Sequence, residues 1–170
     1  MGAMHVTIVR GKGQDYITAT RRDGTRAVST FPHKGPFPHD AVHYAVEQAM
    51  GLRGAFWGMV AAGTPPEQIA ELAKAAGHAS ASRARQPDAA IIELLQAERL
   101  VECFEAEIWQ GQGDADTLRE IFRVACESSL VPCPQLDDPR IAQIRDHLAV
   151  LQQHWLSGRI EFDWADRDGD

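Results

Sequence analysis

The sequence predicts an α+β fold in which an N-terminal three-stranded antiparallel meander packs on a bundle of about five or six helices. β-branched and aromatic segments gather in residues 1–32, whereas apolar residues in the helical part, 38–157, recur at helical spacings. A short alternating segment at 159–164 is expected to join the meander as a C-terminal strand. The tail at 165–170 is expected to fray.

Composition limits the class of protein. The chain has 170 residues, which suits a single domain over residues 1–170 that buries a core without disulfide support. A formal charge of −7 argues against general nucleic-acid or anionic-membrane binding, because such proteins concentrate Lys and Arg. The three cysteines show no CxxC spacing, and no apolar run is as long as a membrane span. We therefore expect a cytoplasmic protein with reduced thiols.

The three N-terminal strands are predicted from residue type and turn chemistry. The segments HVTIVRG, DYITATRR and TRAVSTF are rich in β-branched and aromatic residues. Gly11-Lys12-Gly13 separates the first two, and Asp23-Gly24, a strong two-residue hairpin signal, separates the last two. The next segment, PHKGPFPHD, has three prolines in seven residues, so we expect a connector there.

The helices are predicted from apolar spacing and from the capping residues or prolines that begin several of them. They are expected at residues 38–50, 55–63, 65–76, 87–110, 115–129 and 139–156. The third should stop at Gly77, ahead of the polar loop HASASRARQ. In the last, Leu148 and Trp155 should be buried against the long helix at 87–110.

Two glycines in the second helical segment predict close packing. Gly54 and Gly58 are four residues apart, so they leave one helix face bare enough for another backbone to approach. We expect Gly58 to lie against another backbone or a large ring. Phe56 and Trp57, between the two glycines, should pack in the core.

A polar stripe on the first helix indicates a functional site. At about 100° per residue, His39, His43 and Glu47 fall on one line, with Asp40 beside Glu47. Alanine and valine side chains cover the adjoining arc and should face the core. The stripe therefore lies at the margin of the buried face, where a side chain is partly desolvated and still within reach of a ligand.

The long helix carries a second anomaly. Glu98, Glu102 and Glu105 fall in a narrow gap between two apolar stripes. Buried carboxylates are costly unless they are paired, hydrogen-bonded or bound to metal. These three glutamates therefore either form ion pairs, or occupy an exposed part of the helix, or help to complete a site.

Two hypotheses of different classes follow. The first is a divalent-metal site in a metal-binding protein or metal-dependent hydrolase, with Asp40 orienting or deprotonating a metal-bound water. Its candidate ligands lie on the two helices just described and are His39, His43, Glu47, Glu98 and Glu102. Such a mixed set suits Zn, Mn, Fe or Ni about equally. The second hypothesis, which the sequence slightly favours, is a non-catalytic binding or oligomerisation protein that contacts a protein partner or forms a homo-oligomer.

Two resemblances bear on the polar stripe. His39-Asp40-Ala41-Val42-His43 resembles the zincin motif HExxH in its histidine spacing, with Asp in place of the Glu that acts as general base. The third zincin ligand comes from a later element, whereas Glu47 is in the same helix. The wider string PHDxxHxxVExxxGLxGxFWGxxAAG, at 38–63, is similar to one in small bacterial proteins of unassigned function. That similarity implies that the stripe and the Phe-Trp-Gly segment form one unit, and it implies no activity.

Overall fold

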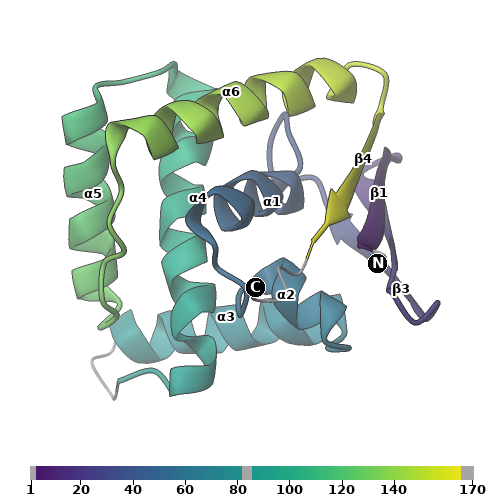
Figure 1. The fold of residues 1–170 in the computed structure, drawn as a ribbon, viewed down its shortest axis with the longest axis horizontal. Helices are drawn as coiled ribbons and strands as arrows, with labels where there is room; N and C mark the ends of the chain where they lie inside the picture. Colours follow the sequence, from purple (N-terminus) through teal and green to yellow (C-terminus); the bar gives the residue numbers. More distant parts are fainter. Residues whose placement is uncertain (1–2, 82–85, 166–170) are drawn as a thin grey trace.

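A four-stranded antiparallel sheet forms one side of the protein, and helices form the rest. The computed structural model describes residues 3–81 and 86–165 (Figure 1). The strands follow the order β3-β2-β1-β4 across the sheet. They are β1 Met4–Arg10, β2 Gln14–Thr20, β3 Arg26–Pro32 and β4 Arg159–Trp164. The α+β class is confirmed, with the N-terminal meander extended by the expected C-terminal strand.

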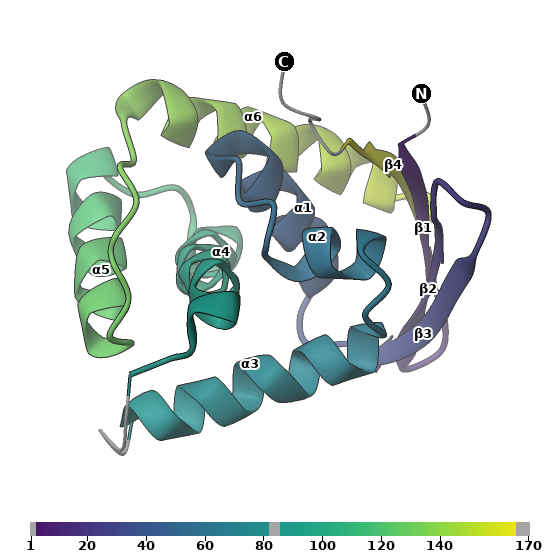
Figure 2. The ribbon, with the colours of Figure 1, turned by 60° about the horizontal axis from the view of Figure 1, so that its bottom comes forward.

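The helices surround a central helix, α4. The described residues form α1 His39–Met50, α2 Phe56–Ala61, α3 Pro66–Ala81, the 3-10 turn η1 Ala89–Ile91, α4 Ile92–Gln110, α5 Ala115–Ser128 and α6 Asp138–Trp155. Figure 2 looks along α4 and shows α5, α6, α1 and α3 arranged around it, with the sheet beyond α1. Not one of the helices described is both long and apolar enough to cross a membrane.

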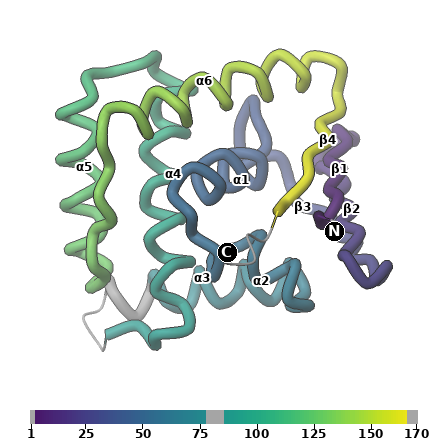
Figure 3. The backbone as a smooth tube through the Cα atoms, viewed as in Figure 1, coloured from purple at the N-terminus to yellow at the C-terminus, as the bar shows by residue number. Residues whose placement is uncertain are grey.

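The sheet joins the two ends of the chain. Ile8 of β1 pairs with Ile17 of β2 on one side and with Ile160 of β4 on the other. All three isoleucines are buried, because alternation along each strand turns them toward the helices. Figure 3 shows the consequence for the chain path, since the last strand lies beside the first.

The packing of α1 beside α4 creates the setting of the site. Ala41 and Ala45 of α1 are fully buried, as the sequence predicts. On α4 one of the two predicted apolar stripes, formed by Leu94, Ala97, Val101 and Phe104, is fully buried. Helices with small residues on the facing side can approach closely. Polar side chains at the edges of these two buried faces are therefore brought together.

The close approach predicted for Gly58 is confirmed. A Cβ atom built on this residue would lie 1.6 Å from the carbonyl oxygen of Arg53, so no larger side chain fits. By contrast, a Cβ atom on Gly113 would meet nothing within 4 Å. Gly58 thus allows the start of α2 to lie directly on the turn that follows α1.

The predicted burial of Leu148 and Trp155 is confirmed, but their expected neighbour is not. Their helix, α6, packs mainly on α1 and β4 rather than on the long helix α4. The guanidinium of Arg10 lies over the Trp155 ring, 4.6 Å from its centroid. The apolar spacing identifies the buried face of a helix, while its partner is decided by the chain topology.

Two predicted helix ends are wrong. α3 continues to Ala81 instead of stopping at Gly77, because Gly77 does not adopt the positive φ of a helix-ending glycine. Residues 82–85 of the expected loop, and 166–170 of the expected tail, lie outside the described residues. The long helix begins at Ile92 after the η1 turn, since the Asp88 side chain does not cap it.

Candidate metal centre

Three side chains from two helices converge at one point. His39 and His43 lie one turn apart on α1, and their Nε2 atoms are 3.2 Å apart. The Glu98 carboxylate on α4 lies against both rings, with Oε1 2.9 Å from His43 Nε2 and Oε2 3.7 Å from His39 Nε2. We call these three residues the His-His-Glu cluster. Each offers one ligand atom, and these atoms lie within 4.8 Å of one another.

The spacing of the His-His-Glu cluster fits a single metal ion. Zinc binds imidazole nitrogen and carboxylate oxygen at about 2.0 to 2.2 Å, so neighbouring tetrahedral ligands are about 3.3 to 3.5 Å apart and octahedral ones about 3 Å. His43 Nε2 lies 3.2 Å from His39 Nε2 and 2.9 Å from Glu98 Oε1, both near these values, whereas the 3.7 Å separation from His39 Nε2 is to the other carboxylate oxygen, Oε2. With one ligand atom from each residue, the three atoms lie within 4.8 Å of one another, and an ion between them would draw the Glu98 carboxylate toward both rings.

Each histidine of the cluster is held from behind by another carboxylate. His39 Nδ1 lies 3.0 Å from Glu105 Oε1, and His43 Nδ1 lies 2.7 Å from Glu47 Oε2. An ionised carboxylate can only accept a hydrogen bond, so each Nδ1–H donates. In the neutral form of each ring, the Nε2 atom is then left with a lone pair that points into the cluster. Metal-ligating histidines in proteins have this same pattern of a carboxylate behind the ring.

Glu47 is fixed by the start of α2. The backbone N–H groups of Phe56 and Trp57 donate to its carboxylate at 3.2 and 2.9 Å. Burial raises the pKa of Glu47, and the hydrogen bonds from His43 and these two N–H groups oppose that rise. Because both oxygens accept hydrogen bonds, the ionised form fits this geometry. The close approach at Gly58 is what brings these N–H groups within reach.

The structure does not bring Glu47 to the point where the two Nε2 atoms meet, although the sequence predicts it as a ligand. It lies one turn beyond His43, so its carboxylate reaches the Nδ1 side of that ring. With three donors already on its oxygens, Glu47 orients His43 instead. The third atom of the cluster comes from Glu98 on a later helix, which the sequence offered as an additional ligand.

Glu102 lies outside the His-His-Glu cluster. Its carboxylate is half-exposed and pairs with Arg99 at 3.0 Å, one turn back on α4. Glu105, which the sequence places in the same gap but not among the ligands, holds His39 instead. At about 100° per residue around the helix axis, Glu105 differs in direction from Glu98 by about 20°, and Glu102 differs from Glu98 by about 40°. This smaller angle could have indicated from the sequence that Glu105, rather than Glu102, lies beside the site with Glu98.

Asp40 lies next to the cluster without joining it. Its carboxylate is buried and lines the same cleft as His39 and His43. Among the described residues it has no side-chain hydrogen-bond partner, and burial raises its pKa. Its backbone oxygen accepts a hydrogen bond from Trp57 Nε1 at 2.8 Å, which ties this turn of α1 to α2. Asp40 is therefore a buried carboxyl group that interacts electrostatically with the cluster.

The carboxylates around the two histidines favour positive charge on them. Burial alone would lower the pKa of His39, but hydrogen bonds to Glu105 and Glu98 outweigh it and raise the pKa to about 9. For His43, burial is likewise outweighed by Glu98 and Glu47, so its pKa is raised well above the ordinary value. Burial would raise the pKa of Glu98, yet the two histidines lower it. The cluster thus holds a proton or another cation strongly.

A cleft of about 890 Å³ gives access to the cluster. Residues of α1, α3, α4 and the sheet line it, and in Figure 2 α3 passes below α4 and the end of the sheet. The His43 side chain is only 1% exposed, whereas that of His39 is 25% exposed. The cluster therefore lies at the floor of the cleft, with His39 on the solvent side.

Comparisons with protein-family models, with curated proteins and with solved structures found no match to the chain. Within residues 3–81 and 86–165, the His-His-Glu cluster is the one group of three or more His, Cys, Asp or Glu that converges closely enough for a metal ion.

Proposed function

We propose that the protein binds one divalent metal ion through His39 Nε2, His43 Nε2 and the Glu98 carboxylate. The observation that carries this proposal is the orientation of the two rings. Both present Nε2 to one carboxylate while another carboxylate holds each Nδ1. A purely structural role would more readily turn the two rings toward different neighbours.

Charge supports a cation at this point. With Nδ1–H groups donating outward, two nitrogen lone pairs and one carboxylate face each other inside the cluster. Three acceptors without a donor repel one another, and in a buried site this repulsion is strong. Either protons on Nε2 or a metal ion removes the repulsion. The ligand distances and the carboxylates behind both rings support the metal.

We further propose that the bound ion activates water for hydrolysis of a small substrate. Catalytic zinc sites use three protein ligands and leave a position open for water, and the His-His-Glu cluster supplies three. A metal lowers the pKa of such a water, which makes a nucleophile near neutral pH. Asp40, buried beside the cluster and with no side-chain hydrogen bond to another described residue, would orient or deprotonate it. Zn, Mn, Fe and Ni all suit this ligand set.

The other hypothesis, a non-catalytic binding or oligomerisation protein, remains a prediction. The sequence slightly favours it, but the convergence of the two histidines on Glu98 moves our preference to the metal site. The two hypotheses differ in one simple respect. In a binding protein without a metal site, replacement of His43 would not change the metal content.

Elemental analysis tests the proposal. The protein would be produced without an affinity tag that needs nickel, exposed to a mixture of Zn, Mn, Fe and Ni salts, and desalted. We expect about one ion per chain in the wild type and in His154→Ala, which removes an exposed histidine of α6. His43→Ala should retain almost none. A wild type without metal after this treatment, or equal metal in all three proteins, would overturn the proposal.

A further inference from the structure

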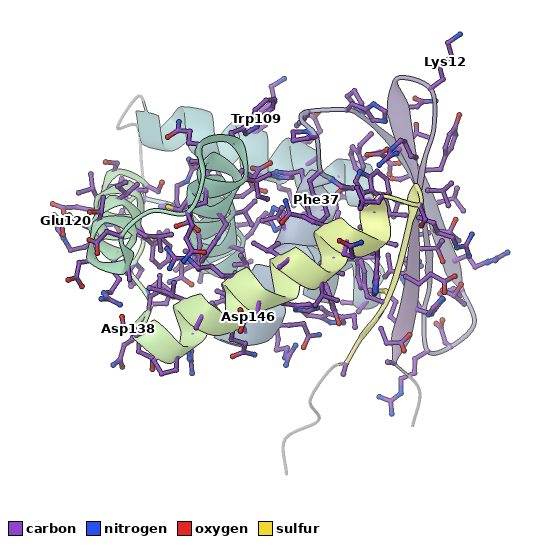
Figure 4. The ribbon with its side chains drawn as sticks, turned by 90° about the horizontal axis from the view of Figure 1, so that it is seen from above. Lys12, Phe37, Trp109, Glu120, Asp138 and Asp146 are labelled. Carbon is purple, nitrogen blue, oxygen red and sulfur yellow. The ribbon has the colours of Figure 1, made fainter. Side chains whose placement is uncertain are left out.

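One tryptophan stands apart from the other three. Trp57, Trp155 and Trp164 are at most 5% exposed, whereas Trp109 is 66% exposed. Trp109 also lines the cleft that leads to the His-His-Glu cluster. Figure 4 shows it extending outward near the end of α4. A large aromatic ring left in water at the edge of a polar site is a common feature of binding surfaces.

The Trp109 ring packs on the connector between β3 and α1, at Gly35. A Cβ atom built on Gly35 would lie 3.3 Å from Cζ2 of this ring, so the glycine lets the ring approach the connector closely. A Cβ atom at this position would therefore be a few tenths of an ångström closer to the ring than ordinary van der Waals contact allows. Gly35 contacts one edge of the ring, while most of the ring surface stays exposed.

The position of Trp109 on α4 sets its distance from the cluster. Glu98, Glu105 and Trp109 follow one another along the helix on the side of the cleft. At a rise of about 1.5 Å per residue, Trp109 lies about 16 Å along the axis from Glu98 and about 6 Å beyond Glu105. The ion would lie closer to Trp109 than Glu98 does, because Glu105 holds the Nδ1 side of the His39 ring whose Nε2 faces the cluster. With Trp109 one turn beyond Glu105, a molecule of about 10 Å could span from the ion to the ring.

The cleft combines a polar floor with apolar walls. The His-His-Glu cluster forms the floor, while Phe31 of β3 and Ala70 and Ala73 of α3 contribute apolar surface to the walls. Phe31 is half-buried, so part of its ring is available to a ligand. Ligand sites commonly pair such apolar walls with a few polar groups that fix orientation.

We propose that Trp109 is a substrate-binding residue, and that the substrates are small acid derivatives with a metal-binding polar group at one end and an aryl group at the other. The polar group binds at the His-His-Glu cluster, and the aryl group lies on the Trp109 ring. This inference rests on the proposed metal site. It adds a residue and a chemical class that the metal site alone does not specify.

Two hydroxamic acids serve as probes, because both chelate divalent metals and they differ only in their tails. Acetohydroxamic acid reaches the ion alone, while 4-phenylbutanohydroxamic acid also carries an aryl group on a chain long enough to approach Trp109. Binding to the zinc-loaded protein would be measured by calorimetry. We expect the aryl probe to bind at least about tenfold more tightly than the acetyl probe in the wild type. It should also protect Trp109 fluorescence from quenching by acrylamide.

Variants separate the contribution of the ring. Trp109→Ala should lose the tenfold preference for the aryl probe and leave acetohydroxamate binding unchanged. Ile121→Ala removes another exposed apolar side chain, one outside the cleft, and should keep the preference. Equal affinities of the two probes in the wild type, or a preference that survives in Trp109→Ala, would overturn the inference. If the protein retains one zinc ion per chain but binds neither probe, or binds the acetyl probe without a preference for the aryl probe, this inference alone is wrong. If the protein retains no zinc, the proposed metal site is wrong as well.

Discussion

His43 Nε2 lies 2.9 Å from Glu98 Oε1, which joins the first turns of α1 to a carboxylate 55 positions later on α4. The same ring donates from Nδ1 to Glu47 on its opposite side. His43 therefore lies between two carboxylates, one fixed by the backbone of α2 and one shared with His39.

Metal binding should tighten as pH rises. In the metal-free protein the pKa of His39 is raised to about 9, so a proton must leave before the Nε2 atom can bind an ion. We expect zinc affinity to increase from pH 6 to about 9 and binding at pH 7 to release protons. Calorimetry in two buffers of different ionisation enthalpy measures that release. Zinc binding with no proton release at pH 7 would show that the cluster is not protonated when empty.

The metal-free protein should lose stability over the same pH range. The folded pKa of His39, about 9, exceeds its ordinary value of 6.5, so its stabilising contribution is full below pH 6.5 and is lost as pH rises through about 9. The melting temperature of the wild type should therefore fall more steeply between these limits than that of His39→Gln. Parallel melting curves for the two proteins across this range would contradict the raised pKa.

Glu47 should matter for metal binding although it does not reach the ion. Glu47→Gln keeps the shape of the side chain but weakens the hydrogen bond that orients the His43 ring. Loss of such a partner typically lowers metal affinity by about 10- to 100-fold. Glu102→Gln is the matched control, since its carboxylate pairs with Arg99 and lies outside the cluster. Competition with a chromogenic chelator measures both affinities, and similar losses in the two variants would remove the orienting role of Glu47.

The glycine beneath α2 should be essential for folding. Gly58→Leu places a side chain where the carbonyl of Arg53 lies, so we expect no stable folded protein or a loss of several kcal/mol in the free energy of unfolding. Gly113→Leu enters open space and should cost about 1 kcal/mol or less. Denaturant titration compares the two. Similar unfolding midpoints would contradict the close approach at Gly58.

The sequence predicted the elements of the fold because those depend on local patterns. β-branched and aromatic residues identified the N-terminal strands, alternation identified β4, and the Asp23-Gly24 turn separated β2 from β3. Helix ends were less predictable, since a glycine ends a helix only if it takes a left-handed conformation. Gly51 does so with φ 68°, while Gly77 stays helical. Nothing in the residue type distinguishes these two cases.

Only the part of the site that depends on local spacing was predicted. His39 and His43 were recognised because one helical turn fixes their separation, and that relation is local. The role of Glu47 depends on N–H groups of α2, and the role of Glu98 depends on how α4 packs beside α1. These are tertiary relations that a single sequence does not determine. The same limit is why Glu98 and Glu102 were both predicted as ligands and Glu105 was not.

A crystal structure of the zinc-loaded protein, with anomalous scattering recorded at the zinc edge, tests the metal site most directly. We expect one anomalous peak per chain, about 2.0 to 2.2 Å from His39 Nε2, His43 Nε2 and a Glu98 oxygen, with Glu47 still on His43 Nδ1. A peak elsewhere, or no peak while His39 and His43 keep their present positions, would contradict the assignment of these three side chains as the ligands.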